Sequence, residues 1–305
     1  MKPKPDPVRL TLPATSANLG PAFDAAALAF DIALKLEARP APVYSIKATG
    51  RDPEVCGALE NHLILTTYRE VLQSANRPEV PLALKISNQI PIGKGCGSSA
   101  AARLAGIALA NHYGKLRWSD SQIIGEASRR EHHPDNAAAC WLGGLTVARM
   151  SSESEAEVAL IKPKGKWPLL VAVPPDPLST EEARRVLPTQ YSRADAVTNI
   201  QNSMLLLTAF MQGRGELLRN ALADRIHQPY RAPLCPLLPA LQGLNFHPGI
   251  LGVALSGAGP SVLIFLNSKV PTSKTTKEIA AHLKQRNLSA ELIATAIAAH
   301  GGKQR

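Results

Sequence analysis

The interpretation of this chain turns on one stretch, Pro91-Ile92-Gly93-Lys94-Gly95-Cys96-Gly97-Ser98-Ser99-Ala100-Ala101. Its three glycines stand at alternate positions, which lets the backbone adopt positive φ and approach a ligand without side-chain clashes. The loop opens onto an alanine-rich run, Ser98 to Tyr113, which predicts a buried helix. Free N–H groups and the dipole at such a helix start favour bound phosphate, and the two serine hydroxyls could bind phosphate oxygens or Mg²⁺. The stretch therefore predicts a phosphate-binding loop.

Spacing distinguishes this loop from two common phosphate-binding motifs. It lacks the G-x-x-x-x-G-K-[ST] pattern of a Walker A loop, and no third glycine falls at the G-x-G-x-x-G spacing of a dinucleotide fold. A glycine turn that only caps a buried helix would give the same local pattern, so that alternative stays open at this point.

The composition is that of a folded globular protein. Its 305 residues suffice for one large domain or two moderate ones, with 45% hydrophobic and 19% charged residues. No apolar run approaches the roughly 18 residues of a membrane span. The basic, proline-rich segment 1–7 is not followed by an apolar region, so we expect no signal peptide and a cytoplasmic protein. The four cysteines form no CxxC pair, which argues against a zinc site or a disulfide framework.

The formal net charge of +10 suits an anionic ligand but does not say which one. Nucleic-acid-binding proteins usually cluster their basic residues and often interleave aromatic ones. Here lysine and arginine are scattered and aromatic residues make up only 4% of the chain. We therefore expect no nucleic-acid partner. Only the positive net charge supports that alternative.

Apolar periodicity predicts mixed strands and helices, which indicates an α+β fold rather than a regular doubly wound sheet. A polar, charged segment, 151–166, suggests a boundary between two domains, 8–165 and 166–305. The predicted strands are 8–12, 27–38, 43–48, 82–86, 169–173, 251–255 and 262–266. The predicted helices are 61–74, 98–113, 123–130 with a start at Ser119–Asp120, 194–211, 216–226 and 275–285, with one further element after the last.

Three motifs, in order along the chain, resemble those of the GHMP kinases. The glycine stretch is similar to the family's P-x-G-x-G-L-G-S-S-A-A phosphate loop, with Cys96 in place of the usual leucine; we expect this thiol to pack rather than react. The segment 12–24, LPATSANLGPAFD, resembles the opening motif of homoserine kinases within that family, with Ala22 in place of a glycine. The segment 255–261, LSGAGPS, is similar to the third family motif. Together the resemblance runs from about residue 8 to 265.

Three more segments are similar to homoserine kinases in particular. They are REHHPDN at 130–136, STEEAR at 179–184 and DRIHQPYR at 224–231. The resemblance implies ATP-dependent phosphorylation of L-homoserine to O-phospho-L-homoserine, a step of threonine biosynthesis. It also implies a two-part fold, with an N-terminal part like ribosomal protein S5 domain 2 and a ferredoxin-like C-terminal part. Family members are often dimers, so a homodimer is an expectation as well.

L-homoserine offers a carboxylate, an ammonium and a hydroxyl, and a selective site should answer each of them. Two arginines from separate segments, Arg184 and Arg231, can clamp a carboxylate with forked hydrogen bonds. Asp24 and Asp135 can hold the ammonium, and Asn18 can orient the hydroxyl. The resemblance assigns the residues to these roles, and Asn18, Asp135 and Ser99 form its expected catalytic set. It also brings three further residues to the substrate, namely His133, Thr180 and Gly257.

The resemblance further implies where ATP and Mg²⁺ bind. Asn61 heads a helix where the family contacts the nucleotide, and the phosphates would lie on Pro91, Ile92, Gly93, Lys94, Gly95, Cys96, Gly97, Ser98 and Ser99. Ser99 and a carboxylate would hold Mg²⁺; we favour Glu126, with Glu131 as the competitor. In some GHMP kinases an aspartate at the position of Asp135 is the general base, but in homoserine kinases it looks like a substrate-binding group. The base is therefore left open.

Two rival functions share the expected fold. One is a GHMP kinase for mevalonate, a sugar or shikimate, against which the arginine pair and the opening motif argue. The other is a catalytically silent binding module. Such a module would be expected to lose its phosphate loop or metal ligands, yet Ser98, Ser99 and Asp135 are present.

Overall fold

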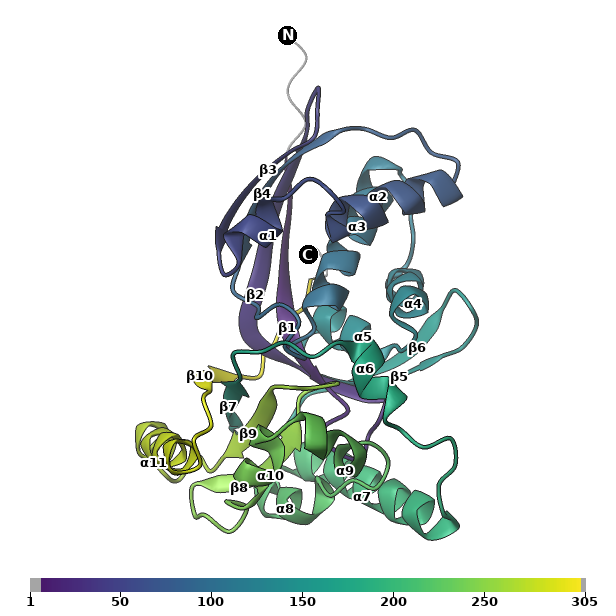
Figure 1. Ribbon diagram of the computed structural model, residues 1–305. Helices are drawn as coiled ribbons and strands as arrows, with labels where there is room; N and C mark the ends of the chain where they lie inside the picture. The colour runs from purple at the N-terminus through teal and green to yellow at the C-terminus, as the bar shows by residue number, and fades with distance from the viewer. Residues whose placement is uncertain (1–6, 303–305) are drawn as a thin grey trace.

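Two β-sheets divide the chain into an upper and a lower part (Figure 1). A computed structural model describes residues 7–302. Residues 1–6, on which the expected absence of a signal peptide depends, and 303–305 lie outside the described residues. Across residues 7–302 no helix combines the length and apolar character needed to cross a membrane.

The upper sheet has six strands in the order β3-β4-β2-β5-β6, with β1 paired along β2. Its strands are β1 (Val8–Ala17), β2 (Ala26–Pro40), β3 (Ser45–Gly50), β4 (Leu82–Asn88), β5 (Leu145–Met150) and β6 (Ala156–Ile161). β1 and β2 pair antiparallel over their whole length, with a bulge between Pro13 and Ala14. β4 alternates buried and exposed side chains, because only one face of the sheet packs against helices.

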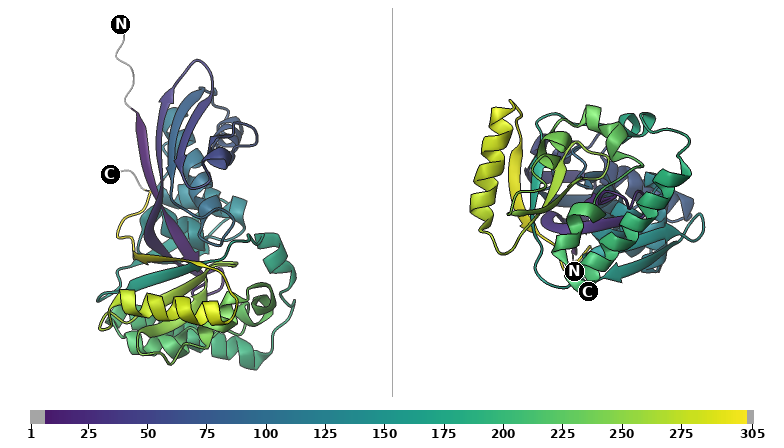
Figure 2. Two further views of the ribbon diagram at one scale, coloured as in Figure 1. Left: turned by 60° about the vertical axis from the view of Figure 1, so that its left-hand side comes forward. Right: turned by 90° about the horizontal axis from the view of Figure 1, so that it is seen from below.

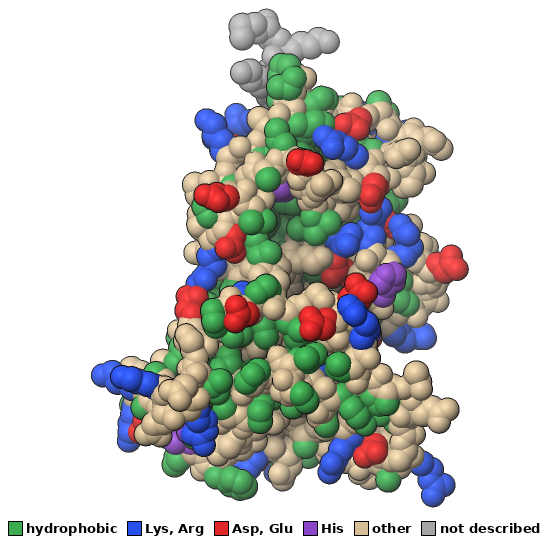
Figure 3. All heavy atoms as spheres, in the orientation of Figure 1, with side chains coloured by type: hydrophobic (Ala, Val, Ile, Leu, Met, Phe, Trp, Pro, Cys, Tyr) green, Lys and Arg blue, Asp and Glu red, His purple; other side chains and the backbone are tan. Residues whose placement is uncertain are grey.

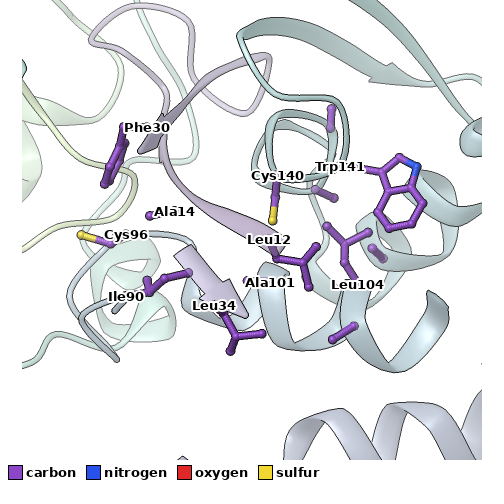
Figure 4. Close-up of a cluster of buried hydrophobic side chains, with 14 of the residues drawn as sticks. Leu12, Ala14, Phe30, Leu34, Ile90, Cys96, Ala101, Leu104, Cys140 and Trp141 are labelled. Carbon is purple, nitrogen blue, oxygen red and sulfur yellow. The ribbon is translucent and has the colours of Figure 1, made fainter. Parts of the chain in front are cut away.

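Among the described residues, five helices belong to the upper part, and α3 runs through its core. They are α1 (Pro53–Gly57), α2 (Leu63–Ser74), α3 (Ser98–Tyr113), α4 (Asp120–Glu131) and α5 (Asp135–Leu142). Small residues let α3 approach its neighbours: a Cβ on Gly106 would lie 2.5 Å from the carbonyl oxygen of Ile64 in α2. Figure 4 shows Ala101 and Leu104 of α3 in the same buried cluster as Leu12 of β1 and Trp141 of α5. The core therefore fixes the helix whose N-terminus carries the glycine loop.

The lower sheet is antiparallel, in the order β10-β7-β9-β8. Its strands are β7 (Pro168–Val173), β8 (Ile250–Leu255), β9 (Val262–Leu266) and β10 (Glu291–Ala296). The accompanying α-helices are α6 (Thr180–Arg185), α7 (Arg193–Gln212), α8 (Leu218–Ala221), α9 (Gln228–Arg231), α10 (Leu237–Gln242) and α11 (Thr272–Gln285). Two 3₁₀ turns, η1 (Gly215–Leu217) and η2 (Ala232–Leu234), join some of them. Seen from below, α11 lies at one side of this part (Figure 2).

The chain changes sheets between β6 and β7, but its end returns to the upper part. After β10, Ile297 pairs with Phe30 of β2, Ala298 accepts a hydrogen bond from Gly144, and Gly302 donates one to Cys140. We propose the domains 8–165 and 166–305, with 297–302 as a returning segment that fastens the lower part to the upper one.

Most predicted elements agree with the structure, and one is wrong. The helix predicted over 98–113 is confirmed as α3. The helix predicted over 216–226 is replaced by η1, the short α8 and a turn. The Asp224 carboxylate accepts backbone N–H bonds from Ile226, His227 and Gln228, which holds that turn in place of a helix. The segment 151–166 also contains a strand, β6, that the sequence did not indicate.

Candidate active site

The glycine loop before α3 is held between the two parts of the molecule. Gly93, Gly95 and Gly97 have φ of 68°, 73° and 72°, the left-handed region that side chains disfavour. A Cβ on Gly95 would lie 2.4 Å from the Ser256 carbonyl oxygen, and one on Gly97 would lie 1.9 Å from Thr15 Oγ1. Glycine is therefore required here both by backbone conformation and by the close approach of the opening and third motifs.

Two hollows meet at this loop. A polar pocket of about 120 Å³ lies between the two parts. A larger apolar cleft of about 760 Å³ lies in the upper part, between the glycine loop, α1 and the start of α2. Both are lined by Gly93, Ser98 and Ser99. Figure 3 shows the middle of this face hollowed, with acidic and basic side chains gathered beside the hollow.

The polar pocket collects all eight predicted substrate residues from distant parts of the sequence. It is lined by the described residues Asn18, Asp24, Gly95, Gly97, Ser98, Ser99, Glu131, His133, Asp135, Asn136, Thr180, Arg184, Arg231 and Gly257, among others. The apolar cleft is lined by Asn61 together with apolar side chains, including Ile64, Ile90 and Ile92.

Three residues predicted to contact the nucleotide line neither hollow. Pro91 is buried. The Lys94 ammonium donates a hydrogen bond to the carbonyl of Pro175. Cys96 points inward, where its thiol contacts the Lys94 carbonyl and Ser261 Oγ, and burial raises its pKa to about 12. The structure therefore brings their backbone, but not their side chains, near the predicted phosphate site.

Two carboxylates and a histidine form an acidic cluster in the polar pocket. One ligand atom from each of Asp24, His133 and Asp135 lies within 4.8 Å of the others. His133 Nδ1 lies 2.6 Å from Asp135 Oδ1. Burial opposes a charge on His133, but the hydrogen bond and negative charge of Asp135 outweigh it and raise the pKa of His133 above its ordinary value. The cluster can hold a small cation.

The two predicted arginines enter the same pocket in different ways. Arg184 donates to both oxygens of Asp24, at 2.8 and 3.0 Å, and its side chain is about one third exposed. Arg231 is buried, and it donates to the carbonyls of Ala183 and Gly257. Burial, followed by the charge of Arg184, lowers the pKa of Arg231 to about 10. Two guanidinium groups thus face the pocket. Arg184 is paired with the Asp24 carboxylate, whereas Arg231 donates to backbone carbonyls.

Two aromatic residues that sequence reasoning did not select support the arginines. The Phe23 ring has the Arg184 guanidinium 5.5 Å and the Arg231 guanidinium 5.4 Å from its centroid. The ring of His227 stacks on Phe23 at 5.3 Å. Phe23 lies in the opening motif, 12–24, and His227 lies in the segment 224–231. Both segments were recognised as motifs, but no role was assigned to either residue from the sequence.

His227 fixes the orientation of Arg231. Burial lowers the pKa of His227 to about 4 although Asp224 opposes the shift, so the ring is neutral near pH 7. Its Nε2 lies 2.8 Å from the Gly20 carbonyl, which requires Nε2 to carry the proton, and its Nδ1 then accepts from Arg231 Nη1 at 3.2 Å. Within residues 7–302, Arg231 Nη2 has no hydrogen-bond partner, so it remains able to bind a ligand in the pocket.

Asn18 connects the opening motif to the third motif. It has positive φ of 68°, its Nδ2 donates to the Gly257 carbonyl at 2.8 Å, and its Oδ1 accepts from the backbone of Asp24 at 2.9 Å. One Nδ2 proton is left for a ligand.

Glu131, rather than Glu126, is brought to Ser99. Ser99 Oγ donates to Glu131 Oε1 at 2.6 Å, and Arg103 donates to the same oxygen. Glu126 instead accepts hydrogen bonds from Arg129 and Arg130 on its own helix and does not line the pocket. A hydroxyl and a carboxylate oxygen are ligands that Mg²⁺ prefers, so the Ser99–Glu131 pair fits such an ion.

Comparison with known proteins identifies the family. Residues 62–144 match the model of the GHMP kinases N terminal domain, and residues 206–286 match that of the GHMP kinases C terminal. A homoserine kinase from Solibacter usitatus is 43% identical over 258 residues, covering 84% of this chain and 84% of that protein. Another, from a Synechococcus species, is 37% identical over 258 residues, with the same coverage of both chains. This chain belongs to the homoserine kinase family of GHMP kinases.

Solved structures confirm the two-part GHMP kinase fold. A homoserine kinase from Cytophaga hutchinsonii matches with a TM-score of 0.82 at 22% identity, covering 99% of this chain and 98% of that one. The mevalonate kinase of L. major, solved with R-mevalonate, matches with a TM-score of 0.70 at 14% identity and 97% coverage of both. The fold is thus common to GHMP kinases. The assignment of this chain to the homoserine kinases among them rests on its sequence relatives.

Proposed function

We propose that the protein is a homoserine kinase, which transfers the γ-phosphoryl group of ATP to the side-chain hydroxyl of L-homoserine. One observation carries the proposal. A single pocket has the glycine loop and the start of α3 on one wall and, on another, the paired positive and negative charges that an α-amino acid zwitterion requires. The family of the chain agrees with this chemistry.

The substrate would bind with its charges matched to the pocket. Arg231 Nη2 and the Arg184 guanidinium would hold the carboxylate, because forked guanidinium groups suit it. Asp24 and Asp135 would hold the ammonium. Thr180 lies at the start of α6 and Gly257 in the third motif, and both line the same pocket beside these groups. The remaining Nδ2 proton of Asn18 would orient the hydroxyl.

The nucleotide would span the two hollows. The adenine would occupy the apolar cleft beside Asn61, because a flat aromatic base suits apolar walls with a few polar groups. The phosphates would follow the glycine loop to the start of α3, where Gly97 begins the helix with no side-chain hydrogen bond to its first N–H groups. Phosphoryl transfer chiefly needs this alignment and charge neutralisation.

Mg²⁺ would be held by Ser99 and Glu131, and when bound it neutralises charge on the transferred phosphate. The expectation that favoured Glu126 is replaced by Glu131 in this proposal, because Glu131 contacts Ser99 and lines the polar pocket, whereas Glu126 does neither. Asp135 Oδ1 already accepts from His133, from the Asn136 backbone N–H and from Asn136 Nδ2. We therefore assign Asp135 to substrate binding rather than to proton abstraction.

We also propose that the protein works in the cytoplasm, as a homodimer and on a small-molecule substrate.

The test is ADP release from Mg²⁺-ATP with a panel of alcohols: L-homoserine, L-serine, mevalonate, galactose and shikimate. We expect turnover with L-homoserine far above that with the others. Turnover with a different alcohol would keep the phosphate site but overturn the substrate assignments. If none is phosphorylated, the chain does not act as a homoserine kinase.

A further inference from the structure

A third hollow lies away from the glycine loop. It is a cleft of about 990 Å³, larger than the apolar cleft beside Asn61. Its walls are formed by the end of β6, the connection from β6 to β7, the turn between β9 and α11, and the segment 295–300. We call it the connection cleft. None of its lining residues lines the polar pocket or the apolar cleft, so it is separate from the candidate active site.

The connection cleft lies where the chain crosses between the two parts. The chain passes from the upper to the lower part through residues 162–167, and it returns to the upper part after β10 (Figure 1). Both crossings line the cleft, together with Leu160 of the upper part and Lys269 of the lower part. Binding pockets occur preferentially at such interfaces between domains. A ligand here would contact both parts of the molecule.

Positive charge gathers around the connection cleft. Lys162, Lys166 and Lys269 line it, and among its described lining residues there is no aspartate or glutamate. Both hollows at the glycine loop, by contrast, include carboxylates. Lys162 and Lys166 are exposed and make no ion pair within residues 7–302, whereas the charge of Lys269 also acts on Glu216. The charge of the cleft therefore favours an anion.

One wall of the connection cleft is apolar and fixed in position. The Trp167 side chain is buried, its Nε1 donates to the Lys164 carbonyl at 2.9 Å, and its ring centroid lies 4.6 Å from that of Phe210 in α7. Leu160, which lines the same cleft, is 46% exposed. A preformed apolar wall lets a ligand bind without the entropic cost of ordering the site. The anion that fits is therefore one with an apolar body.

Two groups in the wall can donate hydrogen bonds to an acid group. Pro271 and Thr272, at the start of the 14-residue α11, line the cleft, and no side chain caps the first N–H groups of this helix. Such free N–H groups and the helix dipole favour an anion. Thr295 also lines the cleft, and its buried Oγ1 has no hydrogen-bond partner within residues 7–302. A buried hydroxyl without a partner is costly, so an acceptor on a ligand would be favourable here.

We propose that the connection cleft binds a small organic anion, in which one acid group is joined to an apolar ring or chain. The acid group lies between the lysines and the start of α11, and the apolar body lies against Trp167 and Leu160. The cleft shares no lining residue with the candidate active site. The proposal therefore does not depend on the kinase function and can fail separately from it.

Isothermal titration calorimetry of the full chain with naphthalene-2-carboxylate tests the proposal. This probe joins one carboxylate to an apolar ring system and has about 13 non-hydrogen atoms, so at ordinary ligand efficiency it should bind with a dissociation constant of about 0.1–1 mM. Naphthalene-2-carboxamide has the same ring system without the charge. It should bind at least about 10-fold more weakly, because the lysines then have no anion to attract.

Variants of the cleft locate the bound probe. Lys162→Glu and Lys166→Glu should each weaken the binding of naphthalene-2-carboxylate about 5- to 20-fold. Ser268→Trp places a large ring on an exposed residue of the cleft and should abolish measurable binding. Lys47→Glu makes the same charge change on an exposed lysine of β3, outside the cleft, and should leave the affinity unchanged. Circular dichroism verifies folding, and Lys→Gln variants replace any charge reversal that does not fold.

A competition experiment separates this cleft from the apolar cleft beside Asn61, which could also accept an aromatic ring. A non-hydrolysable ATP analogue in excess should leave the affinity for naphthalene-2-carboxylate unchanged, and its displacement by the analogue would overturn the proposal. So would an absence of binding up to about 10 mM probe, equal affinity for the carboxamide, or unchanged affinity in the lysine and Ser268→Trp variants. The lysine variants decide the matter whether or not the chain binds ATP.

Discussion

Asp24→Asn tests the proposed ammonium site with little change in shape. The Asp24 carboxylate accepts both bonds from Arg184, while its backbone N–H donates to Asn18 Oδ1. An asparagine keeps the size of the side chain and the backbone bond, so the loop should stay in place. The substitution removes the negative charge that would face the substrate ammonium.

The magnitude follows from the distance and the exposure. Two opposite charges about 4 Å apart attract by about 4 kcal/mol at an effective dielectric constant near 20. The Asp24 side chain is 30% exposed, so water screens part of this energy. We expect a loss of about 2–3 kcal/mol, which corresponds to a decrease in kcat/KM of about 30- to 150-fold.

The assay compares L-homoserine with 4-hydroxybutanoate, which has the same carboxylate and hydroxyl but no ammonium. With 4-hydroxybutanoate the wild type should already lack this interaction, so Asp24→Asn should lower kcat/KM by less than about fivefold. Asp31→Asn, at an exposed position of β2, serves as the control and should affect neither substrate. Equal losses with both substrates would refute an ammonium contact and assign Asp24 to holding Arg184.

Three further outcomes are expected. Glu131→Gln should raise the Mg²⁺ concentration for half-maximal activity about 10- to 100-fold, whereas Glu126→Gln should leave it unchanged; a reversed order in Mg²⁺ titrations would restore Glu126 as the ligand. Because the native pKa of His133 is raised above 6.5, the stability it adds is present below that pH and lost as pH rises through its native pKa. The Tm difference between wild type and His133→Gln should therefore shrink from pH 6 to 9, and a constant difference would contradict the pairing with Asp135. Gly95→Ala should lower the free energy of unfolding by about 2–4 kcal/mol in urea, because it combines a positive φ with a clash against Ser256; a loss under about 1 kcal/mol would mean that the loop relaxes.

The phosphate loop and α3 could be predicted from sequence because their signals are local. Alternating glycines specify the backbone conformation of the loop, and the alanine-rich run after them specifies a buried helix. The observed helix, α3, has 16 residues, and its bounds agree with the prediction. The substrate residues were found through motifs rather than through local physics. Their pairing was not predicted: the Arg184–Asp24 bond joins positions 160 residues apart, and only tertiary packing decides it.

Glu126 and Glu131 show what spacing along the chain leaves open. Five residues along an α-helix correspond to a rotation of about 140°, so the two carboxylates of α4 face different sides. Glu126 has arginines three and four residues later on its own face, which engage it. Glu131 is the last residue of the helix, and His132 ends it with a φ of 67°. Spacing along the chain does not tell which side of α4 faces Ser99, because tertiary packing decides it.

The three motifs contact one another as closely as they are expected to contact ligands. Ser256 Oγ donates to the carbonyl of Gly95, Gly257 N–H donates to the carbonyl of Ala17, and Thr15 N–H donates to the carbonyl of Cys96. These bonds join β1, the glycine loop and the turn after β8, which are far apart in sequence. The glycines therefore serve two demands at once: they let three backbones meet, and they leave the N–H groups at the start of α3 open. A side chain on Gly95 or Gly97 would clash with Ser256 or Thr15 and displace the loop, so the phosphate site depends on how the two parts pack.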